Sequence, residues 1–162
     1  MWGAGVREED LFDAIARDSN AIEPYSIYAD WLIGRGDPRG DWIALQIESM
    51  RSPELLRSAE HDFLAMHGQE LLGSCAVLAS RGVMQVQWRC GFIRALRFSG
   101  AFDAEHHHER FGRMLRCEYL QAILQHPSAR FIEEVDIGDW WTARDRMFDT
   151  DAAAVALAPN TL

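Results

Sequence analysis

The sequence contains no lysine, so all 16 of its basic residues are arginines. This absence excludes a Schiff-base lysine, a lysine general base and the lysine of a Walker A loop. The chain also lacks any apolar run near the roughly 20 residues that a membrane-spanning helix needs. Its first residues, MWGAGVREEDLF, lack the basic stretch and apolar core of a signal peptide. We therefore expect a cytoplasmic protein without a membrane partner.

Cysteine is scarce, and no metal motif is present. Cys75, Cys90 and Cys117 are odd in number and widely spaced, which fits neither a disulfide framework nor a zinc site. The run His106-His107-His108 cannot bind one ion from a helix, because consecutive helical residues point about 100° apart. We expect buried free thiols, a solvated helix start at the histidines, and neither a metal nor a cofactor.

Catalytic motifs are missing as well. Ser74, Ser80 and Ser99 lack the G-x-S-x-G setting of an activated serine, and no Cys–His pair stands out. The net charge of -9 disfavours binding to nucleic acid, which depends on neutralising phosphates. We therefore expect no catalytic residue, no enzymatic activity and no nucleic-acid partner.

The first half of the chain has helical periodicity. Residues 9–17 place Leu11, Ala14 and Ile15 on one face. Pro24 suits the start of a second helix, whose inward side chains would be Tyr25, Tyr28, Ala29 and Leu32. Further helices are expected from Pro38 and from Pro53, so residues 1–82 are predicted to form a helical domain.

The stretch GRGDP (residues 34–38) reads as a corner between two helices. Gly34 and Gly36 suit a helix stop, Asp37 suits an N-cap, and Pro38 suits the first helical position. Arg35 and Arg39 are unexplained by these rules, and we expect them to pair with Asp30, Asp37 or Asp41 while Trp31 packs across the corner. Two alternatives stay open: a docking surface anchored by Trp and Arg, and capture of a phosphate.

The second half combines strands and helices. VMQVQW (83–88) alternates weakly and FIRALRF (92–98) alternates well, as a half-buried strand should, and a tight turn is expected at residues 89–91 between them. A helical pattern then covers residues 104–125. FIEEVDI (131–137) is predicted to be another strand, and residues 151–157 a small helix.

FIRALRF and FIEEVDI share one template and start 39 positions apart (131 minus 92). A strand–helix unit repeated at a fixed period is typical of leucine-rich solenoids, although two parallel strands of an α/β layer can also resemble each other by chance. Arg97 and Asp136 hold equivalent positions and should lie side by side. We expect a partner-binding surface on the concave strand face and at the following tryptophan pair: Arg94, Arg97, Glu133, Asp136, Trp140 and Trp141. Burial of the two tryptophans against the terminal helix is the alternative.

Residues 9–50 resemble the repeat-companion domain found in some large-genome bacteria. The matching segments are Tyr28-Ala29-Asp30-Trp31-Leu32, Arg35-Gly36-Asp37, Pro38, Arg39-Gly40 and Ile43-Leu45-Gln46, and the likeness rests on Tyr28, Asp30, Trp31, Arg35, Asp37 and Arg39. The resemblance implies that the chain continues through a helical linker into a segment like WRCGFIRALRF and then into leucine-rich-like repeats. It implies no catalytic role. This chain departs from the family in having about two repeat units, where relatives often have more.

These observations together predict an α+β, mostly α, protein. A helical repeat-companion domain (residues 1–82) would cap a short leucine-rich-repeat-like α/β segment (residues 83–162). The predicted function is that of a non-catalytic intracellular adaptor whose partner is another protein. The alternative is a small-ligand-binding, phosphate-binding or enzymatic domain that uses the Arg35–Arg39 loop.

Overall fold

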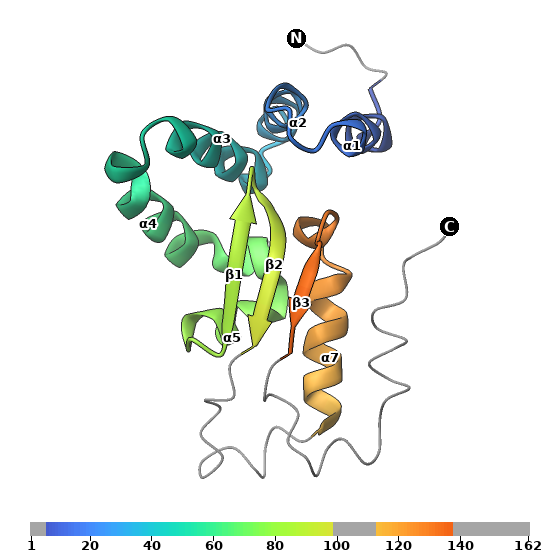
Figure 1. Cartoon of the computed structure of the whole chain (residues 1–162), viewed down its shortest axis with the longest axis vertical. Coiled ribbons are helices and arrows are strands. Elements are labelled where there is room, and N and C mark those ends of the chain that lie inside the picture. The colour runs from blue at the N-terminus through green and yellow to red at the C-terminus, as the bar shows by residue number, and fades with distance from the viewer. Residues whose placement is uncertain (1–5, 99–112, 138–162) are drawn as a thin grey trace. The chain divides into compact units, whose positions relative to one another are not determined.

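The computed structural model describes residues 6–98 and 113–137. These residues form an α+β fold with one three-stranded sheet (Figure 1). In chain order the elements are α1 (Glu8–Arg17), α2 (Glu23–Ile33), α3 (Pro38–Arg51), α4 (Pro53–Leu72), the 3-10 turn η1 (Gly73–Cys75), α5 (Ala76–Ser80), β1 (Met84–Arg89), β2 (Phe92–Phe98), α7 (Arg113–Leu124), the 3-10 turn η2 (Pro127–Ala129) and β3 (Glu134–Asp136).

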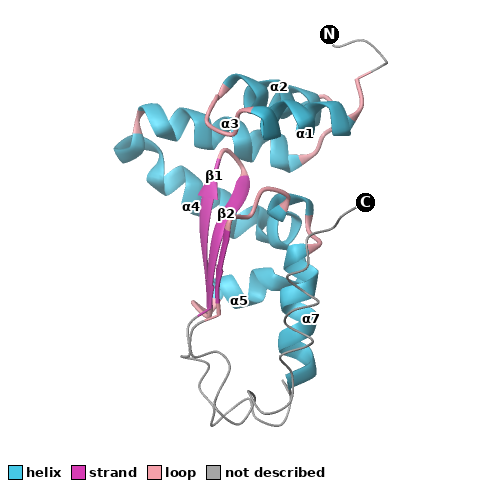
Figure 2. Ribbon diagram, turned by 45° about the vertical axis from the view of Figure 1, so that its right-hand side comes forward, coloured by secondary structure: helices cyan, strands magenta, loops and turns pink. Residues whose placement is uncertain are grey.

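The chain divides into two compact units whose boundary differs from the predicted one at residues 82 and 83. The first unit, the helical unit, comprises Met1–Leu71 together with Trp88–Phe92. The second, the sheet unit, comprises Leu72–Gln87 and Ile93–Leu162. Residues 88–92, which form the tip of the β1–β2 hairpin (Figure 2), therefore belong with helices that precede them by many residues.

Helices α1 and α2 follow the sequence-based prediction closely. Acidic residues occupy the first turn of α1, where they interact favourably with the positive end of the helix dipole. The four side chains expected to point inward from α2 are all buried: Tyr25, Tyr28, Ala29 and Leu32. Both helices thus contribute one apolar face to the core of the helical unit, as their periodicity predicts.

Helices α2 and α3 approach each other closely at Gly40. A Cβ atom at this position would lie 2.7 Å from the carbonyl oxygen of Ala29 and 2.8 Å from the backbone nitrogen of Ile33. Only glycine fits such a contact without a shift of the backbone. Trp42 and Ile43, which follow Gly40 in α3, are then almost completely buried.

A two-residue turn joins β1 to β2. Cys90 and Gly91 have φ values of 45° and 80°, the left-handed pair that a type I′ hairpin requires. The tight turn predicted at this point is confirmed. Gly91 is buried, and a side chain there would collide with the Cγ1 atom of Ile43.

Strand β2 pairs in parallel with β3, and α7 lies between them in the chain. The register joins Ala95 to Glu134, Leu96 to Val135 and Arg97 to Asp136. Each pair differs by 39 positions (136 minus 97), which equals the spacing of the two similar heptapeptides. The prediction that these heptapeptides lie side by side in one sheet is therefore confirmed.

Strand β3 is shorter than the predicted strand of residues 131–137. Ile132 donates its N–H to the carbonyl of Ala129 at 3.1 Å, so this residue still belongs to the turn that follows η2. The described residues contain one strand–helix–strand unit and do not form a leucine-rich array. Residues 104–112 and the predicted helix of residues 151–157 lie outside the described part of the chain.

The sheet unit has its own apolar core. Ile93, Leu96 and Phe98 of β2 are almost completely buried. The other buried apolar residues come from the end of α4 through β1 and from α7: Leu72, Cys75, Leu78, Val83, Met84, Leu120 and Ile123. Across residues 6–98 and 113–137, every helix is too short or too polar to cross a lipid bilayer.

Candidate functional site

The corner between α2 and α3 has the predicted cap. Gly36 adopts a φ of 71°, and the side chain of Asp37 accepts a hydrogen bond from the backbone N–H of Arg39 at 3.0 Å. The Arg39 guanidinium then binds the same carboxylate, with Nη2 at 2.6 Å from Oδ2 and Nε at 3.1 Å from both oxygens. One carboxylate thus caps the helix and neutralises Arg39.

This pair is part of a polar cluster that reaches α1, which we call the corner cluster: Glu8, Tyr28, Asp37 and Arg39. The Tyr28 hydroxyl donates to Oε1 of Glu8 at 2.6 Å, and Nη2 of Arg39 lies 3.9 Å from the same oxygen. Burial raises the pKa of the Tyr28 hydroxyl well above its usual value, and the hydrogen bond to Glu8 raises it further. The cluster holds α1 against the corner by charge-assisted hydrogen bonds, which are stronger than neutral ones.

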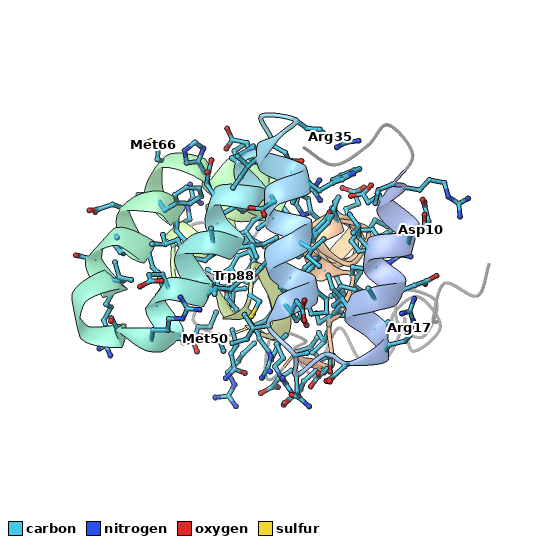
Figure 3. The ribbon with its side chains drawn as sticks, turned by 90° about the horizontal axis from the view of Figure 1, so that it is seen from above. Asp10, Arg17, Arg35, Met50, Met66 and Trp88 are labelled. Carbon is cyan, nitrogen blue, oxygen red and sulfur yellow. The ribbon has the colours of Figure 1, made fainter. Side chains whose placement is uncertain are left out.

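Arg35 stacks on Trp31 at the end of α2. Its guanidinium carbon lies 3.4 Å from the centre of the Trp31 ring, and its Nη1 donates to the Trp31 carbonyl at 3.2 Å. Trp31 in turn donates its indole N–H to the carbonyl of Val6 at 3.4 Å. The expectation that Trp31 packs across the corner is met in this form, while Arg35 stays exposed at the surface of the helical unit (Figure 3).

Asp30 does not hold the corner in the way the sequence suggested. Its side chain is exposed, and no ion pair or side-chain hydrogen bond joins it to another of the described residues. Of the three predicted partners, Asp37 pairs with Arg39, which confirms that part of the prediction. A second carboxylate near Arg39 belongs to Glu8, which lies 31 positions earlier in the chain (39 minus 8). Periodicity within one helix carries no information about such a partner, because the contact depends on how α1 packs.

The strand residues predicted to bind a partner form two ion pairs across β2 and β3. Arg94 Nη2 lies 2.7 Å from Glu133 Oε2, and Arg97 Nε lies 3.0 Å from Asp136 Oδ2. The Arg97 side chain is 66% exposed and the Asp136 side chain is 39% exposed. We call these four residues the strand ladder. Because successive side chains of a strand point to opposite faces, Arg94 and Arg97, three positions apart in β2, lie on opposite faces of the sheet. The two ion pairs therefore do not share the single strand face that the sequence predicted.

Several candidate residues lie outside the described residues. Trp140 and Trp141, predicted as an edge of the partner surface, are among them, as are His106, His107 and His108. Within the part of the chain that the structure describes, no three His, Cys, Asp or Glu side chains come close enough to hold a metal ion.

The described cysteines lack the features of nucleophiles. Cys75 is buried, its Sγ lies 3.2 Å from the carbonyl of Tyr119, and burial raises the pKa of its thiol to about 11. Burial also raises the pKa of Cys90. A reactive cysteine needs the opposite shift, towards the thiolate at neutral pH.

An aromatic cluster at the hairpin tip was not predicted. The Phe92 ring lies 5.8 Å from that of Tyr28, 5.9 Å from that of Tyr25 and 6.3 Å from that of Phe12. Gly91 donates its N–H to Oε1 of Gln46 at 2.9 Å. Phe92 is the first residue of the strand FIRALRF. The alternation of that strand predicts that Phe92 is buried but does not indicate which residues cover its ring.

The chain matches no model of a protein family, no curated protein and no solved structure.

Proposed function

We propose that this chain is a non-catalytic protein-interaction module: a repeat-companion-like helical unit joined to the start of a leucine-rich-like strand–helix array. The observation that carries this proposal is the register of β2 and β3. Two heptapeptides with one template pair at an offset equal to their spacing in the sequence, as successive repeats of a solenoid do. That the helical unit caps the array, and that the protein is cytoplasmic, stay predictions.

The Arg97–Asp136 pair of the strand ladder marks the proposed contact surface, which is the face of the sheet that carries this pair. In strand–helix repeats the exposed strand face is the usual binding surface, and here it carries Arg97 and Asp136 in a solvent-accessible pair. Exposed ion pairs contribute about 0–1 kcal/mol to stability, so they are available to select a partner by charge complementarity.

The contacts at the corner favour this proposal over phosphate capture. Arg39 is already bound by Asp37 and lies near Glu8, so a phosphate would have to displace a carboxylate from it. One face of the Arg35 guanidinium is stacked on Trp31. Both arginines thus have structural partners within the chain.

A charge exchange on the ladder tests the proposal. In the variant Arg97→Asp/Asp136→Arg the two residues can still pair across the strands, but the surface charges are reversed. We expect cross-linking followed by mass spectrometry in cells to identify a partner of the wild-type protein at the ladder, and that partner to be lost in the exchange variant. Arg81→Glu, at another exposed arginine, is the control and should retain the partner.

The competing ligand hypothesis predicts a different pattern. If the loop captured phosphate, calorimetric titration with inorganic phosphate would detect binding to the wild type and none to the variant Arg35→Ala/Arg39→Ala. We expect no phosphate binding at this loop. If phosphate does bind and the exchange variant leaves every partner in place, the adaptor proposal is wrong.

A further inference from the structure

We propose that two copies of this chain pair through the outer edge of β1, which forms an antiparallel β-ladder centred on Val86. This inference is independent of the partner surface proposed above, because that surface lies on β2 and β3, whereas this contact uses the edge formed by β1. The sheet order is β1-β2-β3, so β1 and β3 are its two edges among the described strands (Figure 1).

The backbone groups that point outwards follow from the hairpin. In a two-residue hairpin the residues flanking the turn, here Arg89 and Phe92, form a hydrogen-bonded pair, and the bonding direction alternates along each strand. The N–H and C=O groups of Met84, Val86 and Trp88 therefore face away from β2. Within the described residues, no backbone bond beyond the sheet reaches these three residues.

This edge lacks the features that usually prevent pairing. Natural edge strands are protected by charged side chains, proline or short length. Strand β1 has six residues, and its sequence MQVQWR carries no proline and only one charge, at its last position. Gln85 and Gln87 are its exposed residues.

The charges of the two edges select a second copy of the chain as the occupant of β1. The chain has a net charge of -9, and the segment at the β3 edge bears Glu133, Glu134 and Asp136. Arg94 and Arg97 pair with Glu133 and Asp136, but Glu134, in the middle of this segment, is exposed, so two β3 edges would still oppose like charges. At β1, by contrast, the central residues Gln85, Val86 and Gln87 are all neutral, so a second acidic copy meets no like charge across that edge.

The side chains at this edge are also complementary to themselves. An antiparallel pair centred on Val86 places Gln85 opposite Gln87 of the other copy, and Met84 opposite Trp88. Each glutamine amide is both donor and acceptor, so a Gln–Gln pair satisfies itself without any other residue type. The two-fold arrangement repeats this contact, as an isologous dimer requires.

Sedimentation equilibrium of the full chain tests the dimer. A small interface at one strand edge should associate weakly. As the protein concentration is raised from about 10 µM to about 1 mM, we therefore expect the mass to rise from 18.4 kDa towards twice that value. The variant Gln85→Lys/Gln87→Lys should weaken the dimer at least about tenfold, because it opposes two like charges at each pair.

A matched control separates position from total charge. Gln69→Lys/Gln121→Lys changes two exposed glutamines elsewhere, adds the same charge and should leave the dimer intact. The inference is overturned by a wild-type protein that stays monomeric throughout this range, whether because another segment of the chain covers β1 or because only a different protein binds there. Equal association of both lysine variants would overturn it as well.

Cross-linking tests the register. In a Cys117→Ser background, a mixture of Gln85→Cys and Gln87→Cys should form a disulfide-linked dimer faster than either variant alone. Equal rates in all three samples would exclude pairing about Val86.

Discussion

Gly91 shows how much one residue can determine in this protein. It has a φ of 80° in the hairpin turn and leaves no room for a side chain beside Ile43. Gly36 has a similar φ of 71°, but nothing lies within 4 Å of the position of its Cβ. A substitution at Gly36 therefore measures backbone strain alone, whereas the same substitution at Gly91 measures strain and overpacking together.

We predict that Gly91→Ala lowers the free energy of unfolding by about 2–5 kcal/mol, and Gly36→Ala by about 1–2 kcal/mol. A left-handed residue with a Cβ costs about 1–2 kcal/mol, and overpacking adds about 1–3 kcal/mol only at Gly91. Urea unfolding of both variants measures the difference. Equal losses would mean that the hairpin tip does not pack on α3.

Tyr28 links stability to alkaline pH. The folded state raises the pKa of its hydroxyl, chiefly by burial, so the folded chain keeps this proton when the unfolded chain has lost it. Stability is therefore fully present below the ordinary tyrosine pKa of 10.0 and falls as the pH rises above it. We predict that Tyr28→Phe flattens this decline in urea unfolding measured between about pH 9 and about pH 11.

The same substitution has a second effect at neutral pH. It removes the 2.6 Å hydrogen bond to Glu8 and should cost about 1–2 kcal/mol. A variant as pH-dependent as the wild type would show that Tyr28 titrates normally.

At the scale of the element, β2 combines a buried and an exposed role in adjacent residues. Leu96 is 1% exposed, whereas the Arg97 side chain is 66% exposed. We predict that Leu96→Ala lowers the free energy of unfolding by about 2–5 kcal/mol and that Arg97→Ala lowers it by less than about 1 kcal/mol. Thermal or urea unfolding gives both values, and a large loss at Arg97 would show that the ladder is structural.

The elements differ in how well their sequences predict them. The starts of α2 and α3, the Asp37 cap of α3 and the β1–β2 turn follow from proline, aspartate and glycine, because local backbone chemistry determines them. The pairing of Arg97 with Asp136 was predictable because two similar heptapeptides mark equivalent positions. The Glu8–Arg39 contact and the aromatic cluster around Phe92 were not, since both join residues that only tertiary packing brings together.

At the scale of the whole molecule, the division between the two units does not follow the chain. Residues 88–92 belong to the helical unit, where Trp88 lies 5.4 Å from Trp42 between ring centres and Phe92 contacts three aromatic rings. Cutting the chain between the predicted domains would remove these residues from their core.

We therefore predict that a fragment of residues 1–82 unfolds at lower urea concentration than a fragment of residues 1–98. Loss of the two aromatic side chains from a core costs about 3–5 kcal/mol each. Near-ultraviolet circular dichroism of both fragments measures the transition. A peptide of residues 84–98 should partly restore the shorter fragment, whereas the same peptide with Trp88→Ala and Phe92→Ala should not.

The shared hairpin tip also bears on synthesis at the ribosome. The helical unit cannot be complete until Phe92 has emerged, 21 residues after Leu71 (92 minus 71). At translation rates of about 5–20 residues per second, the nascent helices wait about one to four seconds for their last aromatic residues. During that interval Phe12, Tyr25 and Tyr28 lack the Phe92 ring that contacts them in the folded chain. We therefore expect chaperones to bind the nascent chain at this stage of its elongation.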